Sequence, residues 1–464
     1  MARPASNPAT LVEQIMQEVD RLIASRSLAE GARLPSIRQA AARFGVSKST
    51  VVLAYDRLAS EGVITPRRGA GFFVSSTNTP LRVSEVEPRV DRAVDPLWVS
   101  RQALETPGDA FRPGCGWLPA EWLPDGEIRR ALRRLARTGD ERLVEYGQPT
   151  GPRDLRLQLA RRLSASGVGC EADQVLVTAS ATQAMDLVLR LLLSPGDRVL
   201  VDDPCFFNFL ALLRAHRVEV IGLPMTSEGP DIAALEAALR QHQPKVYITT
   251  AGPQNPTGAT LSLARAHRIL KLAEQHELTI VEDDVFADFE DRPSPRLAAL
   301  DGLERVIQIG SLSKTLSAAV RCGYVAVRRD WVDPLIDLTI ATSYGSGRLS
   351  ADLVLHVLQD PAYRRHLGTL RQRLAEARMR LGSELCEARV RLFHQPVSGM
   401  FLWGELPDDR DATAIARQAL EQKVVLAPGN VFSTSQGARG YMRFNVAQCR
   451  SREDLARLRM LLGH

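Results

Sequence analysis

The hydrophobic positions near the start of the chain recur at a helical period in three stretches and then alternate along a fourth. The apolar residues between positions 11 and 23 fall on one helical face, behind a Thr-x-x-Glu capping box that begins at Thr10. Ser36, with Gln39 three residues on, and Ser47 predict the starts of two further helices. The segment GVITPRRGAGFFV then has the pattern of a two-stranded hairpin. Three helices and a hairpin predict a winged helix-turn-helix over residues 1–75.

A different pattern begins near residue 108, where short apolar runs alternate with helical segments. Seven of these runs have the length of buried strands: Val175–Thr178, Arg198–Val201, Val218–Gly222, Val246–Thr249, Thr279–Glu282, Val306–Gly310 and Gly323–Val327. Helical patterns such as Thr182–Leu193, Asp231–Arg240 and Leu263–His276 separate most of the earlier runs. This alternation predicts an α/β domain with a doubly wound, mainly parallel seven-stranded sheet.

The pattern changes again toward the end of the chain. A long helical pattern near residues 351–389 precedes apolar runs at Met400–Trp403, Val424–Leu426 and Tyr441–Asn445, which are mixed with helices. These elements predict a small α+β subdomain. We therefore divide residues 108–464 into a large subdomain to about residue 340 and a small one from about 341.

Residues 76–107 separate the two modules. They are polar, contain several prolines and have no clear period, which predicts a linker that is partly extended by its prolines. For the second half of this segment, an edge of the large domain is the alternative interpretation.

Composition excludes several classes of protein. The 464 residues are enough for two to four domains, and 45% hydrophobic with 24% charged residues is ordinary for a globular chain. No apolar run approaches the roughly 18 residues of a membrane-spanning helix, and no apolar segment follows Arg3 as in a secretory signal. Six scattered cysteines without a CxxC pair favour reduced thiols in the cytoplasm over a disulfide framework or a zinc site.

The charge is unevenly distributed along the chain. Residues 1–75 carry ten basic and six acidic side chains, so they hold +4 of the net charge of +5. A small basic module is thus joined to a large and nearly neutral one. Such a module favours partners that carry phosphate groups.

Two families share motifs with this chain. The stretch ARLPSIRQAAARFGVSKSTVVLAYDRLASEGVITPRRGAGFFV resembles the winged helix-turn-helix of GntR-type bacterial repressors. The pieces TASATQAMDL, GPQNPTG, VEDDVFADF, SLSKT, RCGY and YMRFNVA resemble fold-type I, aspartate-aminotransferase-like proteins that bind pyridoxal 5'-phosphate (PLP). In this order, the two together resemble the MocR/GabR-type transcriptional regulators.

The chemistry of PLP singles out one lysine. The cofactor needs a lysine for its Schiff base and a carboxylate at its ring nitrogen. Of the five lysines, only Lys314 follows a predicted strand inside a serine-rich turn, where Ser311 and Ser313 could hold a phosphate group. Arg321, on the same segment, suits bidentate bonds to that phosphate.

The resemblance implies roles for further residues of this large domain. Asp283 would stand at the ring nitrogen, with the adjacent Asp284 as its rival, and Asn255 would bond the phenolic oxygen of the cofactor. Phe206 would stack on the ring, although an aromatic residue there also suits the core. The remaining assignments are Ser180, Ala181 and Thr182 at the phosphate, Arg443 at the carboxylate of a substrate or effector, and Tyr146 reaching the cofactor site of the neighbouring subunit.

One position departs from the family pattern. Many relatives carry a tyrosine two or three residues after the ring-nitrogen aspartate, whereas Val285 and Phe286 stand there in this chain. The site therefore lacks a hydroxyl that would bond the phenolic oxygen. This departure indicates that efficient transamination is not the main task.

The DNA-binding side of the prediction rests on the third helix and the hairpin. Recognition helices enter the major groove by their N-terminal end, which places Ser47, Lys48, Ser49 and Thr50 near base edges or phosphates. Arg38 and Arg33 are candidates for phosphate contacts. Arg67 and Arg68, at the tip of the hairpin, could reach the backbone or the minor groove.

These features together predict a PLP-dependent, DNA-binding transcriptional regulator whose aminotransferase-like domain senses PLP or an amino compound. The resemblance implies a cytoplasmic homodimer that presents two winged helices to an operator in double-stranded DNA. The alternative is a working aminotransferase with an accessory DNA-binding segment, and a PLP-free regulator with a relic domain is a third hypothesis. The effector and the operator sequence do not follow from these residues.

Overall fold

The N-terminal module of the computed structural model forms as its capping residues predict. The structure describes residues 10–24, 28, 31–67, 70–75, 97–106, 110–137 and 144–463. The chain divides into two compact units, one up to Asp91 and one from Arg92, and each is described by itself. In the first unit, the elements are α1 (Leu11–Ala24), α2 (Ile37–Phe44), α3 (Lys48–Ser60), β1 (Ile64–Arg67) and β2 (Gly71–Val74).

Local hydrogen bonds set the bounds of these helices. The Thr10 and Glu13 side chains form the predicted reciprocal bonds at the start of α1, and Ser36 with Gln39 does the same for α2. Ser47 caps α3 through the backbone N–H of Thr50. The inner faces of the three helices and the hairpin then enclose a core that contains Ile15, Val51, Tyr55, Leu58 and Ile64. The predicted winged helix-turn-helix is confirmed.

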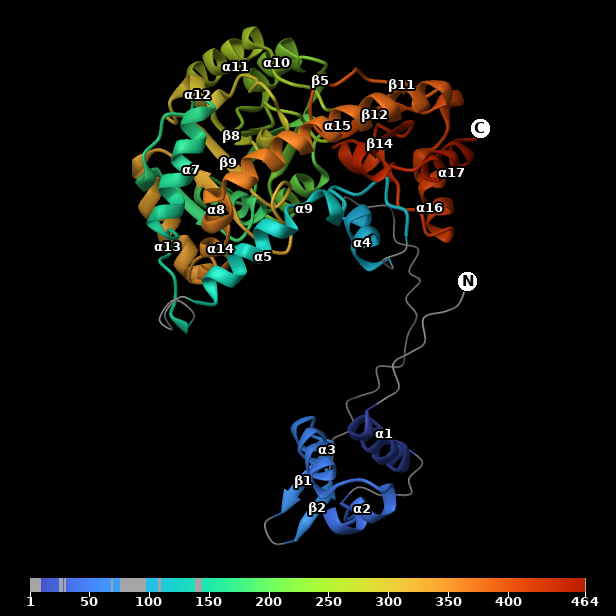
Figure 1. The fold of residues 1–464 in the computed structure, drawn as a ribbon. Helices are drawn as coiled ribbons and strands as arrows, with labels where there is room; N and C mark the ends of the chain where they lie inside the picture. The colour runs from blue at the N-terminus through green and yellow to red at the C-terminus, as the bar shows by residue number, and fades with distance from the viewer. Residues whose placement is uncertain are drawn as a thin grey trace. The chain divides into compact units, whose positions relative to one another are not determined.

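The second unit is built around an eight-stranded sheet (Figure 1). Its order is β3-β10-β9-β8-β7-β4-β5-β6, and the central pairs are parallel, while β10 runs antiparallel to both of its neighbours. The strands are β3 (Val175–Thr178), β4 (Arg198–Asp203), β5 (Glu219–Thr226), β6 (Gly229–Pro230), β7 (Val246–Thr249), β8 (Thr279–Asp283), β9 (Val306–Ser311) and β10 (Gly323–Ala326). All seven predicted strands are present, and β6, which has two residues and no pattern of its own, is the addition.

Helices cover both faces of this sheet because successive strand residues point to opposite sides. Leu200 and Ile280 pack on one face, while their neighbours Val201 and Val281 pack on the other. The first face carries α5 (Asp125–Leu135), α7 (Arg153–Ala165), α10 (Ile232–His242), α11 (Leu263–Gln275), α12 (Leu297–Asp301) and α14 (Arg348–Gln359). The second face carries α8 (Ala181–Leu192), α9 (Phe207–Ala215) and α13 (Val332–Ser343). The doubly wound architecture is confirmed.

The small subdomain is a four-stranded antiparallel sheet with helices. The strands, in spatial order, are β11 (Arg391–Leu392), β12 (Phe401–Glu405), β14 (Tyr441–Asn445) and β13 (Ala427–Pro428). They pack with α15 (Pro361–Glu387), α16 (Ala412–Glu421) and α17 (Arg452–Leu462). The predicted run Val424–Leu426 lies just before β13, and its Val425 instead exchanges backbone hydrogen bonds with Phe111 and Gly114.

The border between the two subdomains lies later than residue 341. The helical pattern near 351–389 is two helices, because Pro361 starts α15 and cannot continue α14. Val354 in α14 and Leu367 in α15 belong to the core under the large sheet, whereas Leu370 belongs to the small-subdomain core. Figure 1 shows α15 running from one subdomain into the other. The apolar side chains of α15 thus pack in one core at its start and in another core further along. The period of apolar residues in its sequence does not show where this change occurs.

The segment expected to be a linker also differs in its second part. Residues 76–96 and 107 lie outside the described residues, but Trp98–Glu105 form the helix α4. Trp98 and Val99 are buried in the core of the small subdomain, and Ala103 packs on Cys115 and Val425. A helix anchored by three buried apolar residues is part of the large unit, in line with the alternative interpretation for this half of the segment.

Candidate functional site

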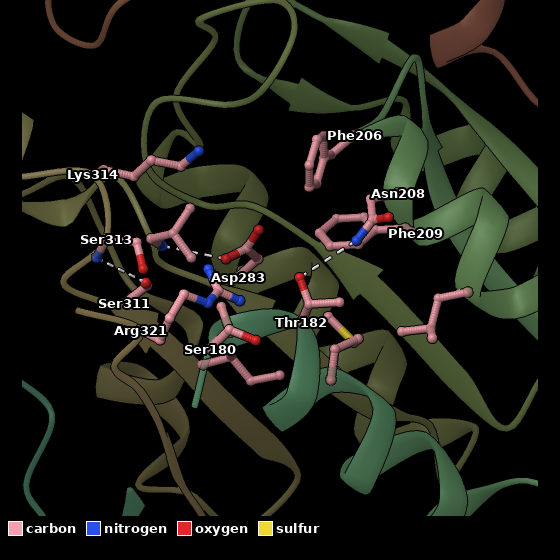
Figure 2. A pocket seen from close by; sticks show the side chains of 15 residues that line it. Ser180, Thr182, Phe206, Asn208, Phe209, Asp283, Ser311, Ser313, Lys314 and Arg321 are labelled. Atoms are coloured by element: carbon pink, nitrogen blue, oxygen red, sulfur yellow. Dashed lines mark hydrogen bonds between the residues drawn. The ribbon is translucent and has the colours of Figure 1, made fainter. Parts of the chain in front are cut away.

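A cavity opens where the ends of β8 and β9 meet the N-termini of α8 and α9 (Figure 2). Nine of the predicted cofactor residues line it: Ser180, Ala181, Thr182, Phe206, Asp283, Ser311, Ser313, Lys314 and Arg321. These residues come from four separate segments of the chain. Crevices at the carboxyl ends of parallel strands are where open α/β sheets bind ligands.

Lys314 lies in the turn after β9, and its amine points to one side of the cavity in Figure 2. Its Nζ donates a hydrogen bond of 2.7 Å to the carbonyl oxygen of Gly116. Burial lowers the pKa of Lys314 to about 8, and the positive charge of Arg443 adds to that effect. An amine with this pKa is neutral in a substantial fraction of molecules near pH 8, which is the form that attacks a carbonyl carbon.

The two adjacent aspartates at the end of β8 have different surroundings. Asp283 faces the cavity, and among the described residues the one hydrogen bond to its carboxylate comes from the backbone N–H of Val285 at 3.3 Å. Burial raises the pKa of Asp283 to about 7. Asp284 instead accepts bonds from Arg296 at 2.8 Å and from Gln308 at 2.7 Å. The first carboxylate is thus free to bind a ligand, while the second belongs to a buried ion pair.

Hydroxyl groups and a guanidinium gather at another side of the cavity, where Figure 2 shows Arg321 beside Ser180 and Ser311. Ser180 caps α8, so the first N–H groups of that helix face this region. The N–H of Ser313 donates to the hydroxyl of Ser311 at 3.1 Å. The hydroxyl of Ser313 is buried and has no partner among the described residues. A helix N-terminus, an arginine and an unused hydroxyl fit an anion such as a phosphate.

Aromatic and apolar residues complete the cavity. Phe206 lines it from the start of α9 and also contacts the rings of Phe207 and Phe209. Val285 lines the cavity as well, and Phe286 is buried against Phe401. No hydroxyl therefore stands at the two positions where the family pattern has tyrosine. Further lining residues, to which the sequence analysis assigned no role, are Met185, Asn208, Phe209, Leu212 and Ile309.

Asn255 and Arg443 form a second group, which does not line this cavity. Arg443 lies in β14 and is only 1% exposed, and its Nη1 donates to the side-chain oxygen of Asn255 at 2.7 Å. Its Nη2 donates to the carbonyl oxygen of Gly114 at 2.6 Å, and its Nε is buried without a partner among the described residues. The rings of Phe401 and Phe432 lie 4.3 and 4.8 Å from the guanidinium. Burial lowers the pKa of Arg443 to about 9.

The segment from Pro113 to Trp117 connects the two buried cations and was missed by sequence reasoning. Gly116 accepts from Lys314, and Gly114 accepts from Arg443. A Cβ added at Gly114 would collide with the backbone of Leu426 and Ala427, so only glycine fits there. The spacing Gly-Cys-Gly was the available signal, but nothing local in it indicates that carbonyl groups would meet charges more than 190 residues away.

Tyr146 lies outside both groups. Its side chain is 84% exposed, and its ring is 5.7 Å from the ring of Tyr344. The single chain does not bring it to the cavity that contains Lys314. A contact of Tyr146 with the cofactor site of a neighbouring subunit stays a prediction.

The basic residues of the N-terminal module fall into two sets. Arg21 and Arg43 pair with Glu18 of α1. Neither of these two was predicted to contact DNA. Within the described part of the module, the predicted DNA contacts of positive charge form no ion pair; they are Arg33, Arg38, Lys48 and Arg67, all exposed. Ser47 and Ser49 are exposed, Thr50 is partly buried, and the hydroxyls of Ser49 and Thr50 bond that of Ser47. Arg68 lies outside the described residues.

Arg33 and Arg67 are brought together by the hairpin. Arg33 forms an isolated β-bridge with Phe73 of β2, and the guanidinium of Arg67 lies 4.5 Å from the ring of the same phenylalanine. Both cations are therefore positioned at the wing, although they lie 34 positions apart in the chain. The described part of the chain contains no helix that is long and apolar enough to cross a lipid bilayer.

Comparison with known proteins identifies both parts of the chain. Residues 122–459 match the family described as aminotransferase class I and II, and residues 11–74 match the bacterial regulatory proteins of the gntR family. The chain is 31% identical over 460 residues to the uncharacterized HTH-type transcriptional regulator YdcR of Escherichia coli, covering 96% of this chain and 97% of that protein. It is 30% identical to a 2-aminoadipate transaminase of Thermus thermophilus, over 74% of this chain and 88% of the enzyme.

A solved structure shares the fold of the large unit. It is an alpha-aminoadipate aminotransferase from Thermus thermophilus in complex with N-(5'-phosphopyridoxyl)-L-leucine, with a TM-score of 0.72 and 27% identity. The match covers 78% of this chain and 94% of that one. The match supports the fold-type I assignment for the residues that carry the cavity.

Proposed function

We propose that this chain, which belongs to the MocR/GabR-type regulators, is a PLP-dependent, DNA-binding transcriptional regulator. In these regulators, a gntR-type winged helix-turn-helix is fused to an aminotransferase class I and II domain. The first unit binds an operator in double-stranded DNA. The large unit senses PLP or an amino compound that reacts with it.

The lining of the cavity fits PLP. Lys314 would hold the cofactor through its amine, and Asp283 would hold a proton at the ring nitrogen. Ser180, Ser313 and Arg321 would bind the phosphate, where the hydroxyl of Ser313 now lacks a partner. When bound, PLP supplies an aldehyde for amines and a ring that accepts electrons. The observation that carries this proposal is that an amine of lowered pKa, a free carboxylate and an anion-binding corner line one cavity.

The remaining assignments concern the effector. Arg443 would bind a carboxylate of the effector with Asn255 beside it, and its unused Nε leaves capacity for one more bond. Asn255 would also reach the phenolic oxygen of the cofactor, and Phe206 would stack on its ring. Arg443 donates a hydrogen bond to the carbonyl oxygen of Gly114, so the carboxylate of an effector would compete with that oxygen for the guanidinium. An effector shifts the equilibrium between two arrangements of the protein only if it binds them with different affinities.

Two identical subunits would complete the regulator. In the proposed homodimer, Tyr146 of each chain reaches the partner's cofactor site, and two winged helices meet two operator half-sites. Its exposed ring beside Tyr344 supports this proposal because two neighbouring exposed aromatic side chains suit an interface.

Reduction with borohydride tests the lysine. The treatment converts a lysine-linked PLP into a stable amine, and peptide mapping then locates the added mass. We expect it on Lys314 alone. Lys314→Ala should lose the visible absorbance of bound cofactor and remain folded, while Lys271→Ala, at an exposed lysine of α11, should keep it. Cofactor mapped to another residue, or to none, would overturn this assignment.

A working aminotransferase is the second candidate function. It is favoured by the match to the transaminase of Thermus thermophilus and by the nine predicted cofactor residues that line the cavity. The valine and phenylalanine after Asp284 argue against efficient turnover. Steady-state assays with 2-oxoglutarate and a panel of amino acids discriminate the two, because a regulator binds DNA and gives at most slow turnover, whereas an enzyme turns over repeatedly.

A further inference from the structure

The exposed face of α3 carries an apolar side chain where DNA-reading helices usually carry polar ones. We propose that Val52 packs on the 5-methyl group of a thymine in each operator half-site, which makes Val52 a specificity-determining residue. This inference rests on the DNA-binding function proposed above.

The position of Val52 follows from the two faces of α3. Val51, Ala54, Tyr55 and Leu58 are buried in the core of the module. Val52 is 37% exposed, although a valine gains free energy by burial. It lies four residues after Lys48 and three after Ser49, so it shares their helical face. Because the N-terminal end of a recognition helix faces the base edges, Val52 is the next side chain to reach them.

The chemistry of the other exposed side chains on α3 narrows what this helix can read. All of its residues are described, and none is asparagine or glutamine. Its one arginine, Arg57, lies in the last turn and interacts with Glu13 of α1. Paired hydrogen bonds to adenine, and those of arginine to guanine, are therefore not available from the groove-facing turns. Lys48 and the hydroxyl of Ser49 remain as donors, and Val52 remains as an apolar contact.

Thymine is the base that presents an apolar group in the major groove. The surroundings of Val52 favour DNA over a protein as the partner, because Lys48, one turn before Val52, and Arg38 of α2 are exposed and have no acidic partner among the described residues of the module, so both can bind phosphate groups. Asp56, one turn beyond Val52 and exposed, carries a negative charge and would be repelled by phosphate groups. The part of α3 that contacts bases thus extends from its N-terminal end to about Val52.

The test uses the full-length protein and a duplex selected from a random library. Each thymine of the selected half-site is replaced in turn by deoxyuridine, which lacks only the 5-methyl group. For one thymine per half-site, we expect Kd to rise about fourfold, which is the change in affinity that corresponds to the burial of one methyl-sized group. Val52→Ala should bind the parent duplex about fourfold more weakly and be insensitive to that replacement.

Leu53→Ala is the matched control, since Leu53 is 48% exposed on the same helix but lies one position further around it. It should retain the sensitivity of the unaltered protein to deoxyuridine. The inference is overturned if no thymine methyl affects binding, or if Val52→Ala remains as sensitive as the parent. If no duplex is selected at all, the DNA-binding function fails first, and that result is distinct from a selected duplex without methyl dependence.

Discussion

The winged helix-turn-helix and the cofactor cavity use charge in opposite ways. In the first, Arg33, Arg38, Lys48 and Arg67 are exposed and have no acidic partner in the part of the module that the structure describes, so water and salt screen their charges in the absence of DNA. In the second, Lys314 and Asp283 are buried, as is Arg443 of the neighbouring group, and burial shifts each pKa in the direction that favours the neutral form. The comparison teaches that the DNA-binding surface exposes its charges to solvent, whereas burial in the large unit disfavours the charged forms until a ligand brings partner charges.

This difference also separates stability from function. Removing an exposed cation changes little in the folded state, and its effect appears in binding. Removing a buried charge changes both, because the fold without its ligand carries the cost of desolvation. Three variants test this contrast, and they are ordered here from the largest expected effect to the smallest.

Asp283→Asn should stabilise the cofactor-free protein at high pH. The pKa of Asp283 is raised from 3.8 to about 7, so the native state binds its proton more tightly than the unfolded chain does. The stability of the parent therefore falls as pH rises from about 4 to 7, and the variant escapes this loss. At pH 8 the gain is on the order of 4 kcal/mol, from about 1.4 kcal/mol per pKa unit. Urea unfolding at pH 5 and pH 8 measures it.

Asp284→Asn is the control for that variant, since the two residues are adjacent. Asp284 is paired with the buried Arg296, and losing one partner of such a pair costs about 3–5 kcal/mol. We expect destabilisation at both pH values. Equal behaviour of the two variants would mean that Asp283 is also paired, which would remove the contrast between the two regions. Asp283→Asn should in addition weaken PLP binding.

Gly114→Ala should destabilise the large unit by about 1–3 kcal/mol, the usual cost of overpacking. The added Cβ collides with the backbone of Leu426 and Ala427, which cannot yield as a flexible side chain would. The collision also displaces the carbonyl group that Arg443 bonds. Thermal unfolding should show one shifted transition, while the DNA-binding unit is unaffected. Gly368→Ala, at an exposed helical position with open space, should be neutral or stabilising.

Arg38→Ala should leave stability unchanged and weaken DNA binding by less than the two effects above. The loss of one phosphate contact reduces the magnitude of the negative slope of log K against log salt concentration by about 0.9. Binding titrations at several salt concentrations measure this slope. Arg21→Ala, whose guanidinium pairs with Glu18, should keep the parent slope. An unchanged slope for Arg38→Ala would show that this residue touches no phosphate.

The success of sequence reasoning differed between the two regions for a physical reason. The start of α2 follows from Ser36 and Gln39, which lie within one helical turn, and the continuous apolar runs of β3 and β7 mark strands that are buried on both faces. Lys314 and Asp283 were predicted because each follows a strand with a recognisable motif. The border inside α15 was misplaced, because a helix can keep one period while its apolar face changes from one core to another.

The sequence by itself determined the caps, the strands, the basic residues of the N-terminal module and nine of the residues that line the cavity, since these are marked by local motifs. Only the tertiary structure decided that Asp283 and not Asp284 faces the cavity, and that Gly114 and Gly116 meet Arg443 and Lys314. These outcomes depend on segments that are remote in the chain and on which side of a strand end each group projects. Burial then sets their ionisation, and burial is a property of the packed fold that no local pattern contains.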